Sequence, residues 1–202
     1  MVFEATELTL DAWTTTAWTE LGLAASNLSH PWSHMVLGTV SENGPRQRTV
    51  ILRAVGPENW QMVFFTDLRS PKIAELQRDP RISCLCYDAV SRVQMTVSGR
   101  ARLHLNDTLS KLFWERIPVD SRRNYVGLQP PGALIDPPST NLSSELPETG
   151  LTEEQRAHGR DHFAVVEIKA HSWEILQLRR SGNFRAKFWT SGESCEGTWI
   201  EP

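Results

Sequence analysis

The hydrophobic pattern of the first thirty residues has the period of an α-helix. The apolar side chains that recur three or four positions apart are Leu10, Trp13, Ala17, Trp18 and Leu21. This spacing places them on one helical face, and Asp11 lies near the helix start, where acidic residues are favoured. We therefore expect an amphipathic helix over about residues 9–28.

From residue 35 the pattern changes to short runs of β-branched and aromatic residues. The expected strands are 35–40, 47–55, 61–66, 82–87, 93–104, 163–168, 173–178, 184–189 and 198–200. Turn residues between the first three runs predict hairpins. Many short strands with few helices favour a small closed or partly open barrel over a sandwich, because the long strand 93–104 can bend and pair on both sides.

Two shorter helices and one long loop complete the expected elements. Ser70 is a good N-cap and Pro71 a good first residue for a helix over 71–78, and a second helix is expected over about 108–116. Residues 127–150 are rich in proline and serine, which predicts a loop or a mobile lid. We expect one domain over residues 1–202, of the mainly β class with helices (α+β).

Composition excludes several functions. A length of 202 residues suits one domain with a real core, and a formal net charge of -3 provides no global basic field for nucleic acid. No apolar run approaches the roughly 20 residues of a membrane span, and the N-terminus lacks the features of a signal peptide. We expect a cytoplasmic protein that binds neither nucleic acid nor membrane.

The cysteines and histidines give no sign of a disulfide framework or a metal site. The chain has three cysteines, an odd and sparse set. Cys84 and Cys86 lie two apart on an expected strand, so both face the same side and suit a core. His30 and His34 have the spacing of helical zinc ligands, but Pro31 makes a regular helix through both unfavourable.

The turn that enters the helix over 71–78 carries the most specific chemistry. A helix N-terminus offers unpaired amides and about half a positive charge to an anion. Arg69 and Lys72 add full charges and Ser70 adds a hydroxyl, a combination that suits a terminal phosphomonoester. The alternative is an ordinary capped surface helix with solvated cations.

Two arginines frame the β-branched run before this turn. Arg48 and Arg53 are five residues apart, so on a regular strand they point to opposite faces unless a bulge intervenes. One could then bind a phosphate while the other covers a different part of a ligand or a partner subunit. The alternative is that both are edge-strand charges that discourage aggregation.

The strand 93–104 offers a polar face. Gln94, Thr96 and Ser98 share that face, and Val93, Met95 and Val97 lie on the other. An amide can donate to a carbonyl and accept from an imide, which is the pattern on the pyrimidine edge of a flavin. The alternative is that this face is only exposed to solvent.

Together these segments resemble a known family. The order Arg-x-Val-x-x-Arg at 48–53, Phe-Thr-Asp-Leu-Arg-Ser-x-Lys at 65–72 and Gln-x-x-x-x-Gly at 94–99 is similar to the pyridoxamine 5'-phosphate oxidase family of FMN-binding split barrels. The similarity covers about residues 39–102 and resumes more loosely at 163–202. The sequence of residues 66–70, Thr-Asp-Leu-Arg-Ser, resembles that of the oxidase-related FMN-binding branch, whose members often lack an assigned substrate.

The resemblance implies a split β-barrel, an FMN cofactor, a small-molecule substrate and a homodimer with FMN at the subunit interface. The FMN contacts that it implies are Arg48, Thr49, Val50, Ile51, Leu52, Arg53, Phe65, Thr66, Arg69, Ser70, Lys72, Gln94, Gln129 and Arg185. Lys72 and Ser70 would hold the phosphate, Gln94 would bond the flavin edge, and Gln129 would come from the second subunit.

Two further roles concern the reaction. Arg53 is the candidate catalytic residue, because a cation beside the flavin stabilises developing negative charge. Arg116 is the candidate substrate-binding arginine. The chain departs from the true oxidase at Leu176, where the family carries a tryptophan, and residues 181–185 lack the Arg-x-His pair that grips the substrate phosphate.

These departures leave three functions open. The first is an FMN-dependent oxidoreductase with an unassigned substrate, in which the flavin performs the redox step. The second is a non-catalytic protein that stores, senses or transfers FMN. The third is a split barrel that binds haem or a deazaflavin, although no histidine here is a persuasive haem ligand.

Overall fold

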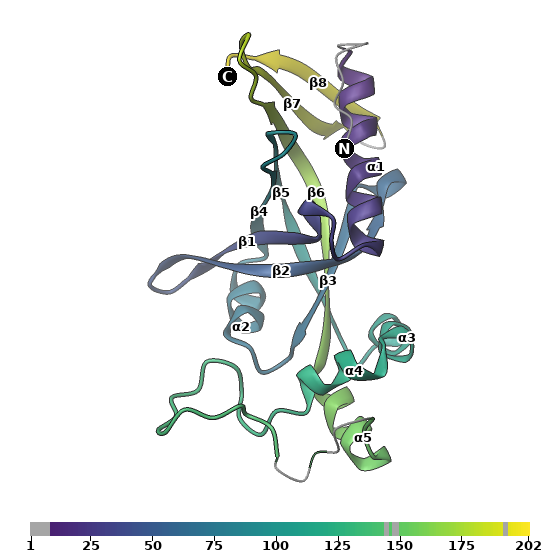
Figure 1. The fold of residues 1–202 in the computed structure, drawn as a ribbon, viewed down its shortest axis with the longest axis vertical. Coiled ribbons are helices and arrows are strands. Elements are labelled where there is room, and N and C mark those ends of the chain that lie inside the picture. Colours follow the sequence, from purple (N-terminus) through teal and green to yellow (C-terminus); the bar gives the residue numbers. More distant parts are fainter. Residues whose placement is uncertain (1–8, 144–145, 147–149, 192–193) are drawn as a thin grey trace.

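A closed barrel of six strands forms the centre of the molecule (Figure 1). The computed structural model describes residues 9–143, 146, 150–191 and 194–202. The barrel strands are β1 (His34–Ser41), β2 (Gly44–Gly56), β3 (Gln61–Asp67), β4 (Arg81–Asp88), β5 (Val93–Leu105) and β6 (Phe163–Gln177). Their order is β3-β2-β1-β4-β5-β6, and pairing of β3 with β6 closes the barrel. The predicted α+β class and the split barrel are confirmed.

The long strand β6 links the barrel to a two-strand extension. Its first half pairs with β3 as far as Lys169, and its second half, from Ser172, pairs with β7 (Phe184–Ser191), which in turn pairs with β8 (Ser194–Ile200). The prediction of two separate strands over 163–168 and 173–178 is therefore wrong. The polar residues near His171 interrupt the apolar pattern, but a register shift against β5 absorbs the extra residue and the strand continues.

Within the described residues, five α-helices surround the sheet. They are α1 (Leu10–Ser26), α2 (Pro71–Arg78), α3 (Thr108–Arg116), α4 (Val119–Arg122) and α5 (Glu153–His162). The N-cap of α1 is Thr9, whose hydroxyl accepts from the Ala12 amide at 3.2 Å. The predicted helices over 9–28, 71–78 and 108–116 are confirmed within two residues. In the described part of 127–150 the backbone forms no helix or strand.

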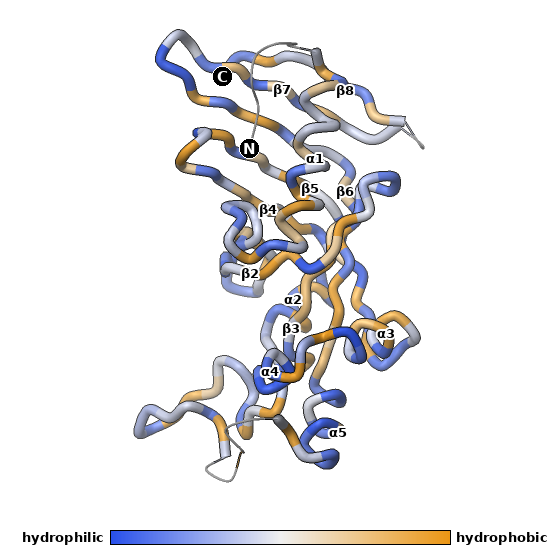
Figure 2. Tube along the Cα trace, turned by 45° about the vertical axis from the view of Figure 1, so that its right-hand side comes forward, coloured by the Kyte–Doolittle hydropathy of each residue, from blue (hydrophilic) through white to orange (hydrophobic). Residues whose placement is uncertain are grey.

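Helix α5 was not expected from the sequence. It has almost no apolar side chains, and Figure 2 shows it as a mainly hydrophilic segment. A capping box holds its start: the Thr152 hydroxyl accepts from the Gln155 amide and the Gln155 side chain accepts from the Thr152 amide. This Thr-x-x-Gln pattern was the available sequence signal.

The side chains of β3 alternate between two hydrophobic clusters. Met62 and Phe64 enter the main core inside the barrel, which also holds Cys84 and Cys86 of β4. Val63 faces the other way, into a smaller cluster with Trp114, Ile117, Tyr125, Phe163 and Val165. All three cysteines are free. None of the helices in the described ranges is long and apolar enough to span a membrane.

Candidate functional site

The N-terminus of α2 holds a lysine between two hydroxyls. Lys72 Nζ donates to Ser70 Oγ at 2.7 Å and to Thr66 Oγ1 at 2.9 Å. Ser70 occupies the N-cap position as predicted, but its hydroxyl accepts from Lys72 and makes no side-chain cap. Burial lowers the pKa of Lys72 and the charge of Arg48 lowers it further, against smaller opposite effects of Asp67 and Glu75. An anion bound beside Lys72 would therefore stabilise the charged form of its side chain.

A cavity of about 210 Å³ opens in front of this lysine. Its lining residues are Arg46, Arg48, Ser70, Pro71, Lys72, Pro131 and Gly132. Two arginines of β2, one lysine of α2 and the start of the Pro-rich loop thus surround one space, which we call the phosphate cavity. Guanidinium forks, an ammonium group and a hydroxyl are the donors that proteins use for phosphate.

A buried carboxylate lies behind the phosphate cavity. Glu75 of α2 has a side chain that is 7% exposed, and its Oε2 lies 2.7 Å from Arg48 Nη2. Thr39 Oγ1 donates to the same oxygen at 2.6 Å, Arg48 also donates to Thr39, and Arg46 lies 3.3 Å from Oε1. Burial raises the pKa of Glu75, but hydrogen bonds from Thr39 and Arg48 and the two arginine charges outweigh it and hold that pKa below its usual range. The group is an anion at neutral pH.

The segment over 48–52 alternates between core and surface. Val50 and Leu52 are buried in the main core, whereas Thr49 is exposed and Ile51 is half-buried on the outer face. Val50 and Leu52 can therefore offer a ligand only backbone groups. Arg48 is two residues from Val50 and so lies on the same strand face as the core residues, but it is at the end of the barrel, beside α2.

Arg53 lies at a β-bulge, the case in which the simple alternation of strand faces no longer applies. The pairing moves from Leu52 with Phe64 to Ala54 with Val63, which leaves Arg53 as the extra residue. Its guanidinium carbon is 5.8 Å from the Phe65 ring centroid. Burial raises the pKa of Tyr125, and the charge of Arg53 opposes that rise. Arg53 thus borders the smaller aromatic cluster and is not among the described residues that line the phosphate cavity.

Three of the predicted residues have other surroundings. Arg69 Nη2 pairs with Asp67 Oδ2 at 2.7 Å, and its Nη1 donates to the Gly127 carbonyl at 2.9 Å, so it anchors the start of the Pro-rich loop. The Gln129 backbone is bonded on both sides to the Asn141 side chain, at 2.7 and 2.8 Å. Arg116 is exposed at the end of α3.

A second predicted group gathers on the outer face of the sheet. Gln94, Leu176, Arg185 and Ile200 are successive cross-strand partners on β5, β6, β7 and β8, so their side chains share one face. A cavity of about 560 Å³ lies there, lined by Asn183, Phe184, Arg185, Trp199, Ile200, Glu201 and Pro202. Arg185 pairs with Glu174 at 2.6 Å.

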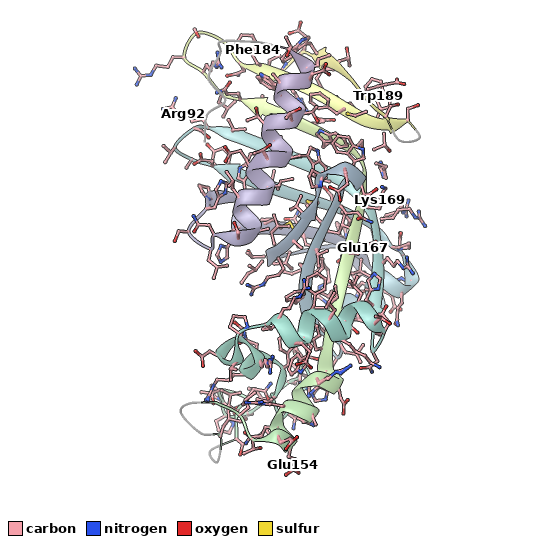
Figure 3. The ribbon with its side chains drawn as sticks, turned by 90° about the vertical axis from the view of Figure 1, so that its right-hand side faces the viewer. Arg92, Glu154, Glu167, Lys169, Phe184 and Trp189 are labelled. Carbon is pink, nitrogen blue, oxygen red and sulfur yellow. The ribbon has the colours of Figure 1, made fainter. Side chains whose placement is uncertain are left out.

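The two groups lie in different parts of the molecule. Phe184, the neighbour of Arg185, lies near one end of the long axis and Glu154 of α5 lies near the other (Figure 3). Helix α2 lies in the half of the molecule that carries α5 (Figure 1). Within one chain, Arg185 therefore does not join Lys72 around a single cavity.

Sequence reasoning missed three members of the site: Thr39, Arg46 and Glu75. Arg46 is two residues from Arg48 and therefore on the same strand face, and Glu75 lies about one helical turn after Lys72. These spacings were visible signals. Thr39, by contrast, meets the site only through the pairing of β1 with β2. No group of three potential metal ligands occurs among the described residues.

Comparisons with known proteins agree with this geometry. Residues 13–105 match the family model "Pyridoxamine 5'-phosphate oxidase, FMN-binding domain". The pyridoxine/pyridoxamine 5'-phosphate oxidase of Aeromonas hydrophila is 32% identical over 161 residues, which cover 79% of this chain and 68% of that protein. The oxidase of the same name from Sodalis glossinidius is 30% identical over 165 residues, which cover 79% and 66% of the two chains.

Solved structures show the same fold. A pyridoxamine 5'-phosphate oxidase-related, FMN-binding protein from Nostoc punctiforme superposes with a TM-score of 0.71 at 19% identity, covering 98% of this chain and 100% of that one. PhzG from Burkholderia lata, in complex with tetrahydrophenazine-1-carboxylic acid, superposes with a TM-score of 0.69 at 17% identity, covering 100% and 98%.

The fold and the match to the family model define an FMN-binding split barrel. The chain belongs to the pyridoxamine 5'-phosphate oxidase family, and its cofactor is FMN. The donors of the phosphate cavity fit the phosphomonoester of that cofactor, because three cations and the Ser70 hydroxyl converge on one space beside a helix N-terminus.

Proposed function

We propose that this protein is an FMN-dependent oxidoreductase that acts on a small molecule. The observation that carries the proposal is the phosphate cavity, where Lys72, held by Ser70 and Thr66, lies beside Arg46 and Arg48. When bound, FMN supplies the ability to accept two electrons from a substrate. The chain's own residues supply binding, orientation and charge.

The predicted cationic residues and Ser70 have distinct proposed tasks within this function. Lys72, Ser70 and Arg48 hold the phosphate. Arg53 is a fixed cation at the edge of the aromatic cluster, and it stabilises negative charge that develops near it during the reaction. Arg116 is exposed and free to meet an anionic substrate group from solvent, whereas Arg69 serves to hold the Pro-rich loop.

We further propose that the working unit is a C2 homodimer with FMN between the subunits. The support is that one chain separates Lys72 from the Gln94 and Arg185 face, although the family resemblance expects all three around one cofactor. An isologous pair places the outer face of one chain against the phosphate cavity of the other.

The three free cysteines fit a reducing compartment, and we propose the cytoplasm.

The rival function is a protein that carries or senses FMN without catalysis. One experiment distinguishes the carrier from the oxidoreductase. The FMN-loaded protein is mixed, in the absence of oxygen, with pyridoxamine 5'-phosphate and then with other small amines. An oxidoreductase loses the visible flavin absorbance with one of these compounds and regains it when oxygen is admitted. A protein that keeps its flavin absorbance with every compound is a carrier. Leu176 and the absent Arg-x-His pair predict that pyridoxamine 5'-phosphate is a poor substrate.

A further inference from the structure

Glu75 is a buried carboxylate in direct contact with the phosphate cavity's arginines. Its two oxygens receive Arg48 at 2.7 Å, Thr39 at 2.6 Å and Arg46 at 3.3 Å. An anion beside a phosphate site is unfavourable unless it performs a task there, because it repels the ligand.

We propose that Glu75 is the positioning residue of the phosphate cavity, with the task of holding Arg48 in the orientation that the phosphate needs. The inference rests on the proposed role of the cavity as the FMN phosphate site. An arginine side chain loses much rotamer freedom when it is fixed, and that cost lowers affinity if it is met only on ligand binding. Glu75 and Thr39 fix Arg48 before the ligand arrives.

The charges of the cavity agree with this task. Arg46, Arg48 and Lys72 carry three positive charges and Glu75 carries one negative charge. The resulting charge of +2 matches a phosphomonoester, which carries about -1.5 to -2 at neutral pH. Glu75 thus orients one cation and still leaves enough positive charge to balance the ligand.

Other roles for Glu75 predict other changes in FMN and riboflavin affinity when its side chain is removed. If Glu75 only reduced the positive charge of the cavity, its removal would tighten FMN binding. If it only stabilised the fold, its removal would weaken FMN and riboflavin binding equally, because riboflavin has the same ring but no phosphate. Positioning of Arg48 predicts a loss that is specific for FMN.

The test is titration of the protein, freed of bound flavin, with FMN and with riboflavin, in Glu75→Ala, Glu75→Gln and Thr39→Val variants. The matched control is Glu42→Ala. Glu42 pairs at 3.1 Å with Arg78 of α2, the helix that carries Glu75, and it is not among the described residues lining the phosphate cavity. The Kd of FMN is expected to rise about tenfold in Glu75→Ala, the size of the cost of fixing one long side chain only when the ligand binds. Glu75→Gln keeps an acceptor oxygen and is expected to recover most of this loss.

The outcomes separate cleanly. Unchanged riboflavin affinity in Glu75→Ala, with weaker FMN binding, supports the proposal. Tighter FMN binding, equal losses for both ligands, or no change for either overturns it. If Glu75→Ala does not fold, Thr39→Val decides by the same comparison, since Thr39 bonds both Glu75 and Arg48. A wild-type protein that binds riboflavin as tightly as FMN contradicts the phosphate site itself, whatever the variants do.

Discussion

At the residue scale, Lys72 is the group on which the cofactor site depends. Its ammonium group is held by two hydroxyls, yet burial and the charge of Arg48 lower its pKa below 10.5. A phosphate placed against it would raise that pKa again. Binding of FMN is then coupled to protonation of this one side chain.

This coupling predicts how FMN affinity depends on pH. Affinity is expected to be full below the pKa of Lys72 in the free protein, and to fall as pH rises from that value toward the higher pKa of the FMN complex. The fall therefore begins at a lower pH than it would for a lysine with the ordinary pKa. Calorimetric titration at a series of alkaline pH values measures it, and Lys72→Arg is the control, because a guanidinium stays protonated throughout. Equal pH profiles for the two proteins would contradict the coupling.

At this scale, proximity of side chains was predictable where the partners are close in sequence. Thr66, Ser70 and Lys72 lie within one turn, so their convergence follows from a strand ending at a helix N-terminus. Arg69 is different, because its guanidinium pairs with Asp67, two residues earlier. Charge and spacing alone did not predict which partner Arg69 would take. Glu75 meets Arg48 only after β2 and α2 pack together, so the sequence indicated Arg48 and Lys72 and missed Glu75.

At the scale of elements, the register shift between β5 and β6 brings Gly99 close to the β6 backbone. A Cβ on Gly99 would lie 2.5 Å from the Lys169 carbonyl oxygen, at the register shift where β6 changes partner from β3 to β7. Gly99→Ala is expected to lower the free energy of unfolding by about 1–3 kcal/mol, the usual range for overpacking. Denaturant unfolding measures the difference.

The matched control lies in α1. Gly22 is exposed in the helix, and a Cβ there meets nothing within 4 Å. Gly22→Ala is expected to raise the free energy of unfolding by about 0.5–1 kcal/mol, because alanine is the better helix former. A Gly99→Ala protein as stable as wild type would show that the register shift between β5 and β6 does not depend on that close approach.

The elements were largely predictable because period and turn residues are local signals. The division of β6 and the omission of α5 arose where that signal is weak. In β6 the polar residues near His171 hide a continuous strand, and α5 has too few apolar side chains to show a helical period. The pairing of β3 with β6 joins residues about 100 positions apart, so local periodicity could not predict which strands close the barrel.

At the scale of the whole molecule, the proposed dimer predicts subunit complementation. Lys72→Ala and Arg185→Ala chains are each expected to bind FMN weakly. If one site uses Lys72 of one subunit and Arg185 of the other, refolding an equal mixture forms hybrids with one intact site, and about a quarter of all sites recover. Sedimentation of the FMN-bound protein as a dimer is expected alongside. No recovery on mixing, or only monomers, would contradict the shared site.

The phosphate site is tested most directly by the affinity of Lys72→Ala for FMN and for riboflavin, compared with Lys111→Ala on the exposed side of α3. Lys72→Ala is expected to raise the Kd of FMN about 10–150-fold, the equivalent of a charge-assisted hydrogen bond. Riboflavin affinity should stay unchanged, and Lys111→Ala should match wild type for both ligands. An unchanged Kd of FMN in Lys72→Ala would contradict the assignment of the α2 N-terminus as the site of the phosphate.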